Sequence, residues 1–415
     1  MTLPTLLLAA SCVRPASPCA CAAGHGFQLA GSEVCQCLPP VEAEDPPEPA
    51  TTFRVDGDEN IDWPAIDEAL ALGHVSLLLS GEREERLDIL RTDEGPYRLT
   101  VDGGEGRAVV PGVHTLYEGP PRHRVTVRRL EVTGSRDKGV YWWAGDEIIL
   151  EDLVVHDNRG SPSVSLEYAN RSGHPSSSFV LRNSHIYDQH GECVYIGGSE
   201  GEDQDAHEAV TVEGNLIHDC RVLLSNKTDG INIKDRIGYA LVRRNVVFHT
   251  DWGVELASPG LYAENLVFQT TSNGFHFNDL WGQGFDEVRL EDNAVIEPGE
   301  AGLRISADER PTDGLVIDRT LIVGAARAGV VLGAGTSLRL GLTDLHIEGS
   351  AQAFEGWGSP DLELTGCTLH DNEQRADDAT SNAAAGCEAA GSVGDLTVLS
   401  GPDHTFFTED DPWRP

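Results

Sequence analysis

Lys234 is the first candidate for chemistry in this chain. It lies in the stretch TDGINIKD, residues 228–235, and it is one of only three lysines among 30 lysine and arginine residues. Lysine can act as a base when burial or nearby cations lower its pKa, whereas arginine does not lose its proton in proteins. Four further residues have types that suit proton transfer or charge stabilisation: Tyr195, Glu255, His276 and Arg304. We expect these five residues to be catalytic if the fold brings them together.

Their positions predict β-strands. The segments ECVYIGG, WGVELAS, NGFHFND and AGLRISA alternate apolar residues with other residues. A period of two with one apolar face predicts strands whose apolar side chains stack inside the protein. Alignment of these segments places one column on the outward face: Tyr141, Ser165, Tyr195, Asn232, Glu255, His276, Arg304 and Val331. A second outward column contains Trp143, Glu167, Gly197, Lys234, Ala257, Asn278, Ser306 and Gly333. With strands about 4.8 Å apart, Lys234, Glu255, His276 and Arg304 would share one cleft.

A repeat explains how such strands could stack. A short motif such as NLIH, NVVF or NLVF recurs from Leu153 to Cys367 at intervals of 20 to 31 residues. Irregular intervals of this length with β-branched residues and Gly, Asn and Asp at the turns indicate a solenoid of β-rungs. Four asparagines at one rung position, Asn215, Asn245, Asn265 and Asn293, could form a ladder of side-chain hydrogen bonds. We predict an all-β, right-handed parallel β-helix of about ten to twelve rungs over residues 53–375.

An amphipathic segment precedes the rungs. Residues 60–73, NIDWPAIDEALALG, have a proline near the first turn and a closing glycine, which predicts an α-helix. Such a helix would cap the open end of the solenoid. Together with the strand segment HVSLLLSGE that follows it and the rungs, the sequence resembles the pectin-lyase-like superfamily of right-handed parallel β-helices.

The resemblance implies a polysaccharide partner bound along an outward sheet face. Many members of that superfamily are lyases, and others are hydrolases or epimerases. A lyase needs a cation for the uronate carboxylate, a base for the C5 proton and an acid for the leaving oxygen. Arg304 or Ca²⁺ could supply the cation, Lys234 or His276 the base, and Tyr195 or His276 the acid. The substrate-binding candidates are Asn232, Glu167, Asn278 and Trp143.

Two classes of function therefore remain open. The first is an extracellular polysaccharide lyase, with a hydrolase or epimerase as lesser variants. The second is a non-catalytic surface protein that binds glycans or serves as a rigid part of the cell envelope. The paired aspartates and Gly-His-Gly turn of polygalacturonases and the Asp-Pro-His-Glu signature of alginate epimerases do not occur in the rungs.

Calcium is the one candidate cofactor. The acidic segment 199–208, SEGEDQDAHE, places Glu202, Asp203 and Asp205 close together in sequence. Carboxylate oxygens are suitable Ca²⁺ ligands, and insertions on one face of a solenoid often build its binding site. The alternative is a solvated acidic turn. By contrast, the recurring pairs His156-Asp157, His218-Asp219 and His370-Asp371 lie on separate rungs, which indicates turn chemistry and not a metal site.

The composition excludes one class of partner. The formal net charge is -38 at pH 7 and the chain contains no arginine-rich run. Phosphate binding needs clustered positive charge, so nucleic acid is not expected as a partner. We expect a monomer.

The cysteines indicate an oxidising compartment. Residues 1–12 resemble a lipoprotein signal peptide that ends at Cys12, the candidate lipidation site, so any membrane contact would be through a lipid. The other eight cysteines are an even number, as disulfides require. Separations close to one rung predict the pairs Cys193 with Cys220 and Cys367 with Cys387.

We assign residues 13–37 to a Cys-rich module, 38–52 to a Pro/Glu-rich linker and 376–415 to a C-terminal cap or tail. The protein would then be secreted or held on the outer cell envelope, most simply as a bacterial lipoprotein.

Overall fold

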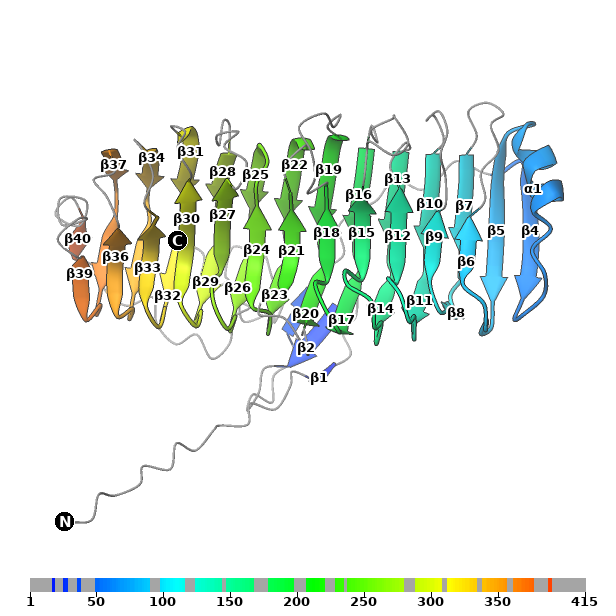
Figure 1. The fold of residues 1–415 in the computed structure, drawn as a ribbon, viewed down its shortest axis with the longest axis horizontal. Coiled ribbons are helices and arrows are strands. Elements are labelled where there is room, and N and C mark those ends of the chain that lie inside the picture. Colours follow the sequence, from blue (N-terminus) through cyan, green and yellow to red (C-terminus); the bar gives the residue numbers. More distant parts are fainter. Residues whose placement is uncertain are drawn as a thin grey trace, which may run out of the picture.

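The computed structural model describes residues 17–18, 25–28, 36–38, 49–89, 98–115, 124–143, 147–167, 178–197, 207–220, 228–234, 237–279, 288–307, 312–333, 338–356, 361–376 and 387–389. Three long parallel sheets run the length of the molecule, and each turn of the chain adds one strand to each sheet (Figure 1). The sheets have 13, 12 and 12 strands, so the number of rungs differs slightly from the ten to twelve expected. The predicted all-β parallel β-helix is confirmed.

We number the three long sheets 1 to 3. Sheet 1 contains β4 (Thr51–Asp56), β5 (His74–Ser80), β7 (Arg98–Asp102), β10 (Arg124–Arg128), β13 (Glu147–Glu151), β16 (Ser178–Arg182), β19 (His207–Glu213), β22 (Ile237–Arg243), β25 (Gly260–Ala263), β28 (Val288–Glu291), β31 (Thr312–Asp318), β34 (Leu338–Thr343) and β37 (Asp361–Thr365). Sheet 2 contains β8 (Ala108–Val110), β11 (Leu130–Thr133), β14 (Val154–His156), β17 (His185–Gln189), β20 (Leu216–Cys220), β23 (Val246–Phe248), β26 (Leu266–Phe268), β29 (Ala294–Ile296), β32 (Leu321–Val323), β35 (His346–Glu348), β38 (Thr368–His370) and β40 (Glu388–Ala389).

Sheet 3 carries the predicted chemistry. Its strands are β6 (Leu87–Ile89), β9 (Val113–Thr115), β12 (Val140–Trp143), β15 (Val164–Glu167), β18 (Val194–Ile196), β21 (Asp229–Ile233), β24 (Trp252–Leu256), β27 (Phe275–Asp279), β30 (Ala301–Ala307), β33 (Ala328–Leu332), β36 (Gln352–Gly356) and β39 (Gln374–Ala376). A separate antiparallel sheet within the predicted Cys-rich module consists of β1 (Ser17–Pro18), β2 (His25–Gln28) and β3 (Gln36–Leu38).

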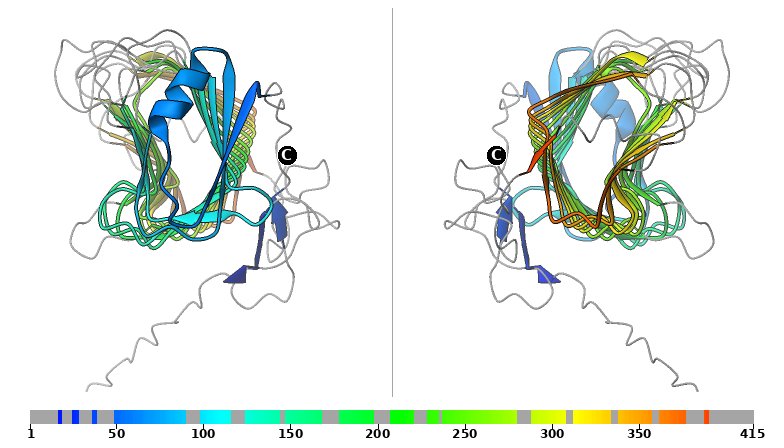
Figure 2. Two further views of the ribbon diagram at one scale, coloured as in Figure 1. Left: turned by 90° about the vertical axis from the view of Figure 1, so that its right-hand side faces the viewer. Right: turned by 90° about the vertical axis from the view of Figure 1, so that its left-hand side faces the viewer.

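The core is the space that the three sheets enclose (Figure 2). Inward residues at the same position of successive turns form stacks, for example Val194, Ile231, Val254 and Phe275 in sheet 3, all 0% exposed. Burial of these stacks is the main favourable term in folding. The asparagine ladder is confirmed, because Nδ2 of Asn215, Asn245 and Asn265 each donates at 3.0 Å to Oδ1 of the next asparagine.

Residues with a left-handed backbone conformation form the sharp bends at the ends of the sheet 2 strands. Asp157 and Asp371 directly follow a sheet 2 strand, Asp188 and Asp219 are the second-last residues of β17 and β20, and all four have φ between 47° and 54°. Aspartate tolerates this conformation better than most residues. The His-Asp pairs therefore mark a repeated turn, as predicted.

The N-terminal end is covered by α1 (Trp63–Leu70), a helix shorter than the 60–73 expected (Figure 2). Asp62 caps it by accepting a hydrogen bond from Ala65 N–H at 3.2 Å, and Ile66 and Leu70 are buried. β4 precedes α1 and pairs in parallel with β5, so the helix follows a first strand that the sequence did not indicate. β4 also begins at Thr51, two residues before the predicted start of the β-helix. Within the residues that the structure describes, no helix is long and apolar enough to cross a membrane.

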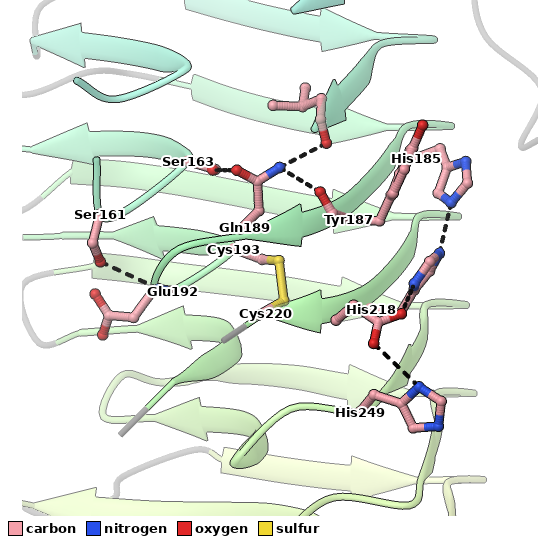
Figure 3. Close-up of a disulfide and its surroundings, with 12 residues drawn as sticks. Ser161, Ser163, His185, Tyr187, Gln189, Glu192, Cys193, His218, Cys220 and His249 are labelled. Carbon is pink, nitrogen blue, oxygen red and sulfur yellow. Dashed lines mark hydrogen bonds and ion pairs between the residues drawn. A yellow bond between two sulfur atoms is a disulfide. The ribbon is translucent and has the colours of Figure 1, made fainter. Parts of the chain in front are cut away.

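Both predicted disulfides of the β-helix are present. The Cα atoms of Cys193 and Cys220 are 5.6 Å apart, and those of Cys367 and Cys387 are 4.5 Å apart. Figure 3 shows the first disulfide joining the turn that precedes β18 to the end of β20. The cysteine side chains of the N-terminal module and Cys12 lie outside the described part of the chain.

Candidate functional site

The outward column of sheet 3 has the predicted register. Tyr141 pairs with Ser165, and the pairing continues through Tyr195, Asn232, Glu255, His276, Arg304 and Val331 without a shift. Figure 1 shows the strands concerned, β12 to β33, side by side. One turn of the chain therefore separates each residue of the column from the next.

A glycine in each of five turns changes which residues face outward at the start of these strands. A Cβ atom on Gly230 would lie 2.4 Å from Val247 Cγ1, and one on Gly253 would lie 2.2 Å from Val267 Cγ1. Position 230 therefore faces the core, as does the next residue, Ile231. Two successive inward positions interrupt the alternation. As a result, Asp229 lies on the outer side with Asn232, whose Nδ2 is 2.5 Å from Asp229 Oδ2.

Asn232 gathers three carboxyl groups. Its Nδ2 atom lies 3.1 Å from Glu192 Oε1, 2.5 Å from Asp229 Oδ2 and 2.9 Å from Glu255 Oε2. A side-chain amide has only two N–H hydrogens, so it cannot satisfy three ionised carboxylates at once. At least one of these carboxyl groups should then hold a proton. Asn232 is fully buried, whereas Glu192 is half-buried.

Glu255 has a second set of donors. Lys234 Nζ donates to Glu255 Oε2 at 3.2 Å, and Asn278 Nδ2 donates to Oε1 at 2.7 Å. Burial by itself would raise the pKa of Glu255, but the Lys234 ammonium and the hydrogen bonds from Asp229 and Asn278 outweigh it and lower the pKa. Glu255 is therefore the ionised member of the cluster.

Asp229 is the protonated member. Burial raises the pKa of the Asp229 carboxyl well above its ordinary value, and the neighbouring carboxyls of Glu255 and Glu192 raise it further. Its proton is donated in a hydrogen bond to Glu255. Burial likewise raises the pKa of Glu192. The carboxyls of Asp229 and Glu255, both in contact with Asn232 Nδ2, thus have pKa values shifted in opposite directions. We call Glu192, Asp229, Asn232, Lys234 and Glu255 the carboxyl cluster.

His276 and Arg304 extend the column beyond this cluster. His276 shares a hydrogen bond between Nε2 and Ser306 Oγ at 3.1 Å, and Trp252 packs edge-on against its ring, with centroids 4.2 Å apart. Arg304 is one turn further and has Nη1 3.8 Å from Glu300 Oε2. On the other side, Lys234 Nζ is 5.7 Å from the centre of the Tyr195 ring.

The structure brings together most of the predicted site. Lys234, Asn232 and Asn278 each donate a hydrogen bond to Glu255, and Tyr195 and His276 occupy the adjoining turns. Trp143 and Glu167 pair with each other in β12 and β15, but their side chains lie outside the described residues. The candidate calcium ligands Glu202, Asp203 and Asp205 also lie outside them. Among the residues that the structure does describe, no three His, Cys, Asp or Glu side chains form a group that could hold a metal ion.

Sequence reasoning missed Asp229 and Glu192. Strict alternation would have placed Asp229 inside, with Ile231 and Ile233. The available signal was a glycine repeated at the same position in TDGIN, DWGVE and SNGFH, which marks a break in alternation. Glu192 lies in a turn outside any strand, so no periodic pattern could place it.

The fold and its repeats define the class to which the chain belongs. Residues 169–398, more than half of the chain, match the family model described as the right handed beta helix region. The chain is a member of this right-handed β-helix family, so the predicted hand of the β-helix is confirmed.

Three solved structures have limited similarity to this chain, with low sequence identity. The catalytic domain of Agl-KA is 12% identical, with 88% of this chain and 73% of that chain covered and a TM-score of 0.47. The pectate lyase Pel9A is 12% identical, with 89% and 90% covered and a TM-score of 0.41. The A-module of the mannuronan C-5 epimerase AlgE6 from Azotobacter vinelandii is 12% identical, with 79% and 92% covered and a TM-score of 0.33. No curated protein sequence matches the chain.

Proposed function

We propose that this protein is an enzyme that cleaves glycosidic bonds in a polysaccharide bound along the outer face of sheet 3. The observation that carries this proposal is the Asp229–Glu255 pair, whose carboxyls lie 2.5 and 2.9 Å from the same Asn232 Nδ2 atom and whose surroundings shift their pKa values in opposite directions. Such pairs supply a general acid and a general base at one site. The straight column of polar side chains, repeated at every turn, suits a linear polymer.

Each residue of the cluster has a role in this proposal. Asp229 gives its proton to the glycosidic oxygen, and Glu255 accepts a proton from the water that attacks the sugar. A proton then passes from Glu255 to Asp229 along their hydrogen bond, which restores the starting state. Lys234 donates a hydrogen bond to Glu255, so we assign it to holding that carboxylate charged and not to the role of base.

Elimination, the reaction of a lyase, is the alternative route. It would need an unprotonated base beside the C5 hydrogen of a uronate and a cation for its carboxylate, for which His276 and Arg304 are the adjacent candidates. The carboxyl cluster favours hydrolysis because it contains both the proton donor and the proton acceptor. We also propose that the activity lies outside the cytoplasm, since two disulfides suit an oxidising compartment.

A substrate screen tests the proposal. The purified protein is assayed against neutral and acidic polysaccharides for new reducing ends, with ultraviolet absorbance to detect the unsaturated uronate ends that only elimination produces. Asp229→Asn, Glu255→Gln and Lys234→Ala should each lower turnover by about two to four orders of magnitude. The matched control is Glu147→Gln, which removes a carboxylate that is 54% exposed on sheet 1, and it should leave turnover unchanged.

Three outcomes would contradict the proposal. Reducing ends that always appear together with unsaturated ends would assign the protein to the lyases. Binding of a glycan with no cleavage would support the non-catalytic alternative. Unchanged turnover in Asp229→Asn would remove the carboxyl cluster from the reaction.

A further inference from the structure

The outward column of sheet 3 continues for three turns beyond Ser165, away from the carboxyl cluster. Tyr141 pairs with His114, and His114 pairs with Asp88. Tyr141 and Tyr195 occupy equivalent positions two turns apart, with Ser165 between them. Because adjacent strands lie about 4.8 Å apart, the two tyrosines are separated by about 10 Å along the face.

Lys138 is held above Tyr141. Its Nζ atom is 4.1 Å from the centre of the tyrosine ring, a distance at which the ring attracts a cation. Both side chains are half-buried. The tyrosine ring thus holds an ammonium group at the outer surface of the sheet.

His114 contacts both Lys138 and Tyr141 and holds them in place. Its ring is 1% exposed, and its Nε2–H donates to the Lys138 carbonyl oxygen at 2.9 Å. The same ring packs edge-on against Tyr141, with centroids 5.6 Å apart and planes at 80°. A buried side chain therefore positions both the turn that carries Lys138 and the ring beneath its ammonium. Preorganisation of this kind lowers the entropic cost of binding.

The arrangement repeats one feature of the carboxyl cluster. Lys234 and Lys138 each stand beside a half-buried tyrosine of the same column, Tyr195 and Tyr141 respectively. The third lysine, Lys227, lies outside the described residues. The chain has a formal net charge of -38, so an ammonium group held on this face is unusual for it. The Lys138 ammonium would attract an anionic group of a polymer that lies along this face.

We propose that Lys138 and Tyr141 form a second binding subsite, which takes the carboxylate of an acidic sugar residue in the same polysaccharide chain. Lys138 forms a charge-assisted hydrogen bond with the carboxylate, and Tyr141 holds the ammonium in place. The subsite rests on the proposed function and narrows it, because it makes the substrate a linear acidic polysaccharide that extends from the carboxyl cluster toward the N-terminal end. It binds the polymer two turns from Tyr195 and takes no part in bond cleavage.

The test measures binding separately from cleavage. Oligogalacturonates of two to eight residues, and neutral malto-oligosaccharides of the same lengths, are titrated calorimetrically into the Asp229→Asn protein. Affinity for the acidic series should increase with length until the oligosaccharide reaches Tyr141. Lys138→Met, which keeps an unbranched apolar side chain, should abolish that last increase and lower the affinity for the longest oligomers about tenfold.

Two control variants define the chemistry. Arg136→Gln removes an exposed cation from the same turn and should leave every affinity unchanged. Tyr141→Phe keeps the ring that holds the ammonium and should bind nearly as wild type, whereas Tyr141→Leu should resemble Lys138→Met. The Lys138-dependent part of the affinity should weaken as salt concentration rises.

The outcomes separate this inference from the proposed function. Equal affinities of Lys138→Met and its parent at every length would overturn the subsite, as would a similar loss in Arg136→Gln or a preference for the neutral series. Cleavage of an acidic polysaccharide by a Lys138→Met protein with unchanged binding would leave the proposed function standing without the subsite. Lys138-dependent binding without any cleavage by the wild type would leave the subsite standing without the proposed reaction.

Discussion

Asp229 and Glu255 have the same functional group and similar burial, 2% and 4% exposed, yet their pKa values are shifted in opposite directions. The difference lies in their neighbours. Glu255 receives hydrogen bonds from Lys234 and Asn278, whereas Asp229 has the carboxyls of Glu255 and Glu192 beside it. Because the two carboxyls receive different hydrogen bonds, Asp229 is suited to donate a proton and Glu255 to accept one.

Replacement of Asp229 by asparagine should lower turnover but raise the thermal stability of the protein. The folded-state pKa of Asp229 is raised, so its stabilising contribution is present below the unfolded-state pKa of about 3.9 and is lost as pH rises through the folded value. Between the two pKa values the unfolded chain ionises Asp229 while the folded protein keeps it protonated, which lowers the stability of the wild type but not that of an asparagine variant. We expect Asp229→Asn to have a higher Tm than wild type at neutral pH, with the difference shrinking toward pH 4.

Thermal unfolding of both proteins between pH 4 and pH 8 measures this effect. Asn278→Ala serves as the comparison, since it removes a donor to Glu255 and should lower Tm at neutral pH. An Asp229→Asn protein that is less stable than wild type at neutral pH would show that Asp229 is ionised in the folded state.

At the scale of the strand, a repeated glycine determines which polar residues face outward at the start of the sheet 3 strands. Gly230, Gly253, Gly274, Gly302 and Gly329 occupy one position in five successive turns, and an added Cβ at each would lie 2.2 to 2.6 Å from a core side chain of sheet 2. These glycines allow the strand to turn tightly from sheet 2 into sheet 3. In the first of these turns, the outward residue before the glycine is Asp229.

Gly253→Ala should therefore destabilise the protein. The new methyl group would lie 2.2 Å from Val267 Cγ1 and 2.6 Å from the Gly274 carbonyl oxygen, and overpacking of this kind costs about 1–3 kcal/mol. Gly341→Ala is the matched control, because a Cβ there meets nothing within 4 Å. Urea unfolding compares the two variants; equal stability would show that the turn can relax around the methyl group.

The asparagine ladder predicts a second loss at this scale. Asn265 Oδ1 accepts from Asn245 N–H and Nδ2, and Asn265 Nδ2 donates to the Val242 carbonyl oxygen. Asn265→Ala would leave these buried groups unsatisfied, so we expect a loss of at least about 2 kcal/mol in the free energy of unfolding. Thr320→Ala changes the same rung position where the side chain bonds only to Asp318 O, and it should cost less. Equal losses in urea unfolding would argue against the ladder as a source of stability.

At the scale of the whole molecule, two disulfides clamp different parts of the solenoid. Cys193 follows Glu192 directly, and its N–H donates to the Asp229 carbonyl oxygen at 3.0 Å (Figure 3 shows Glu192 beside the disulfide). Cys367 and Cys387 lie at the C-terminal end and hold β40 against β38. One disulfide therefore borders the carboxyl cluster and the other does not.

The two disulfides should differ in their effect on activity. Replacement of Cys193 and Cys220 together by serine should cost about 3 kcal/mol of stability and also lower turnover, because Glu192 and Asp229 lose a fixed neighbour. Replacement of Cys367 and Cys387 should cost a similar amount of stability with turnover unchanged. Chemical unfolding and turnover at a temperature where both variants are folded provide the comparison. Equal turnover in the two double variants would show that the first disulfide is structural only.

The sequence by itself determined the features that follow from a repeat. The period of two in each strand fixed the inward and outward faces, and the recurring motif fixed the register, so the column from Tyr141 to Val331 and the asparagine ladder could be written down in advance. The disulfides followed from the same repeat, because residues one rung apart must be neighbours in space.

Only the tertiary structure decided the composition and protonation of the site. Asp229 joins the cluster because the strand breaks its alternation at Gly230, and Glu192 joins it from a turn that no period describes. Lys234 or His276 was expected as the base, and only the structure shows that the Lys234 ammonium donates a hydrogen bond to Glu255. The physical reason is that a repeat fixes which backbone positions are adjacent, whereas the charge of a side chain depends on its burial and on the groups that reach it from other turns.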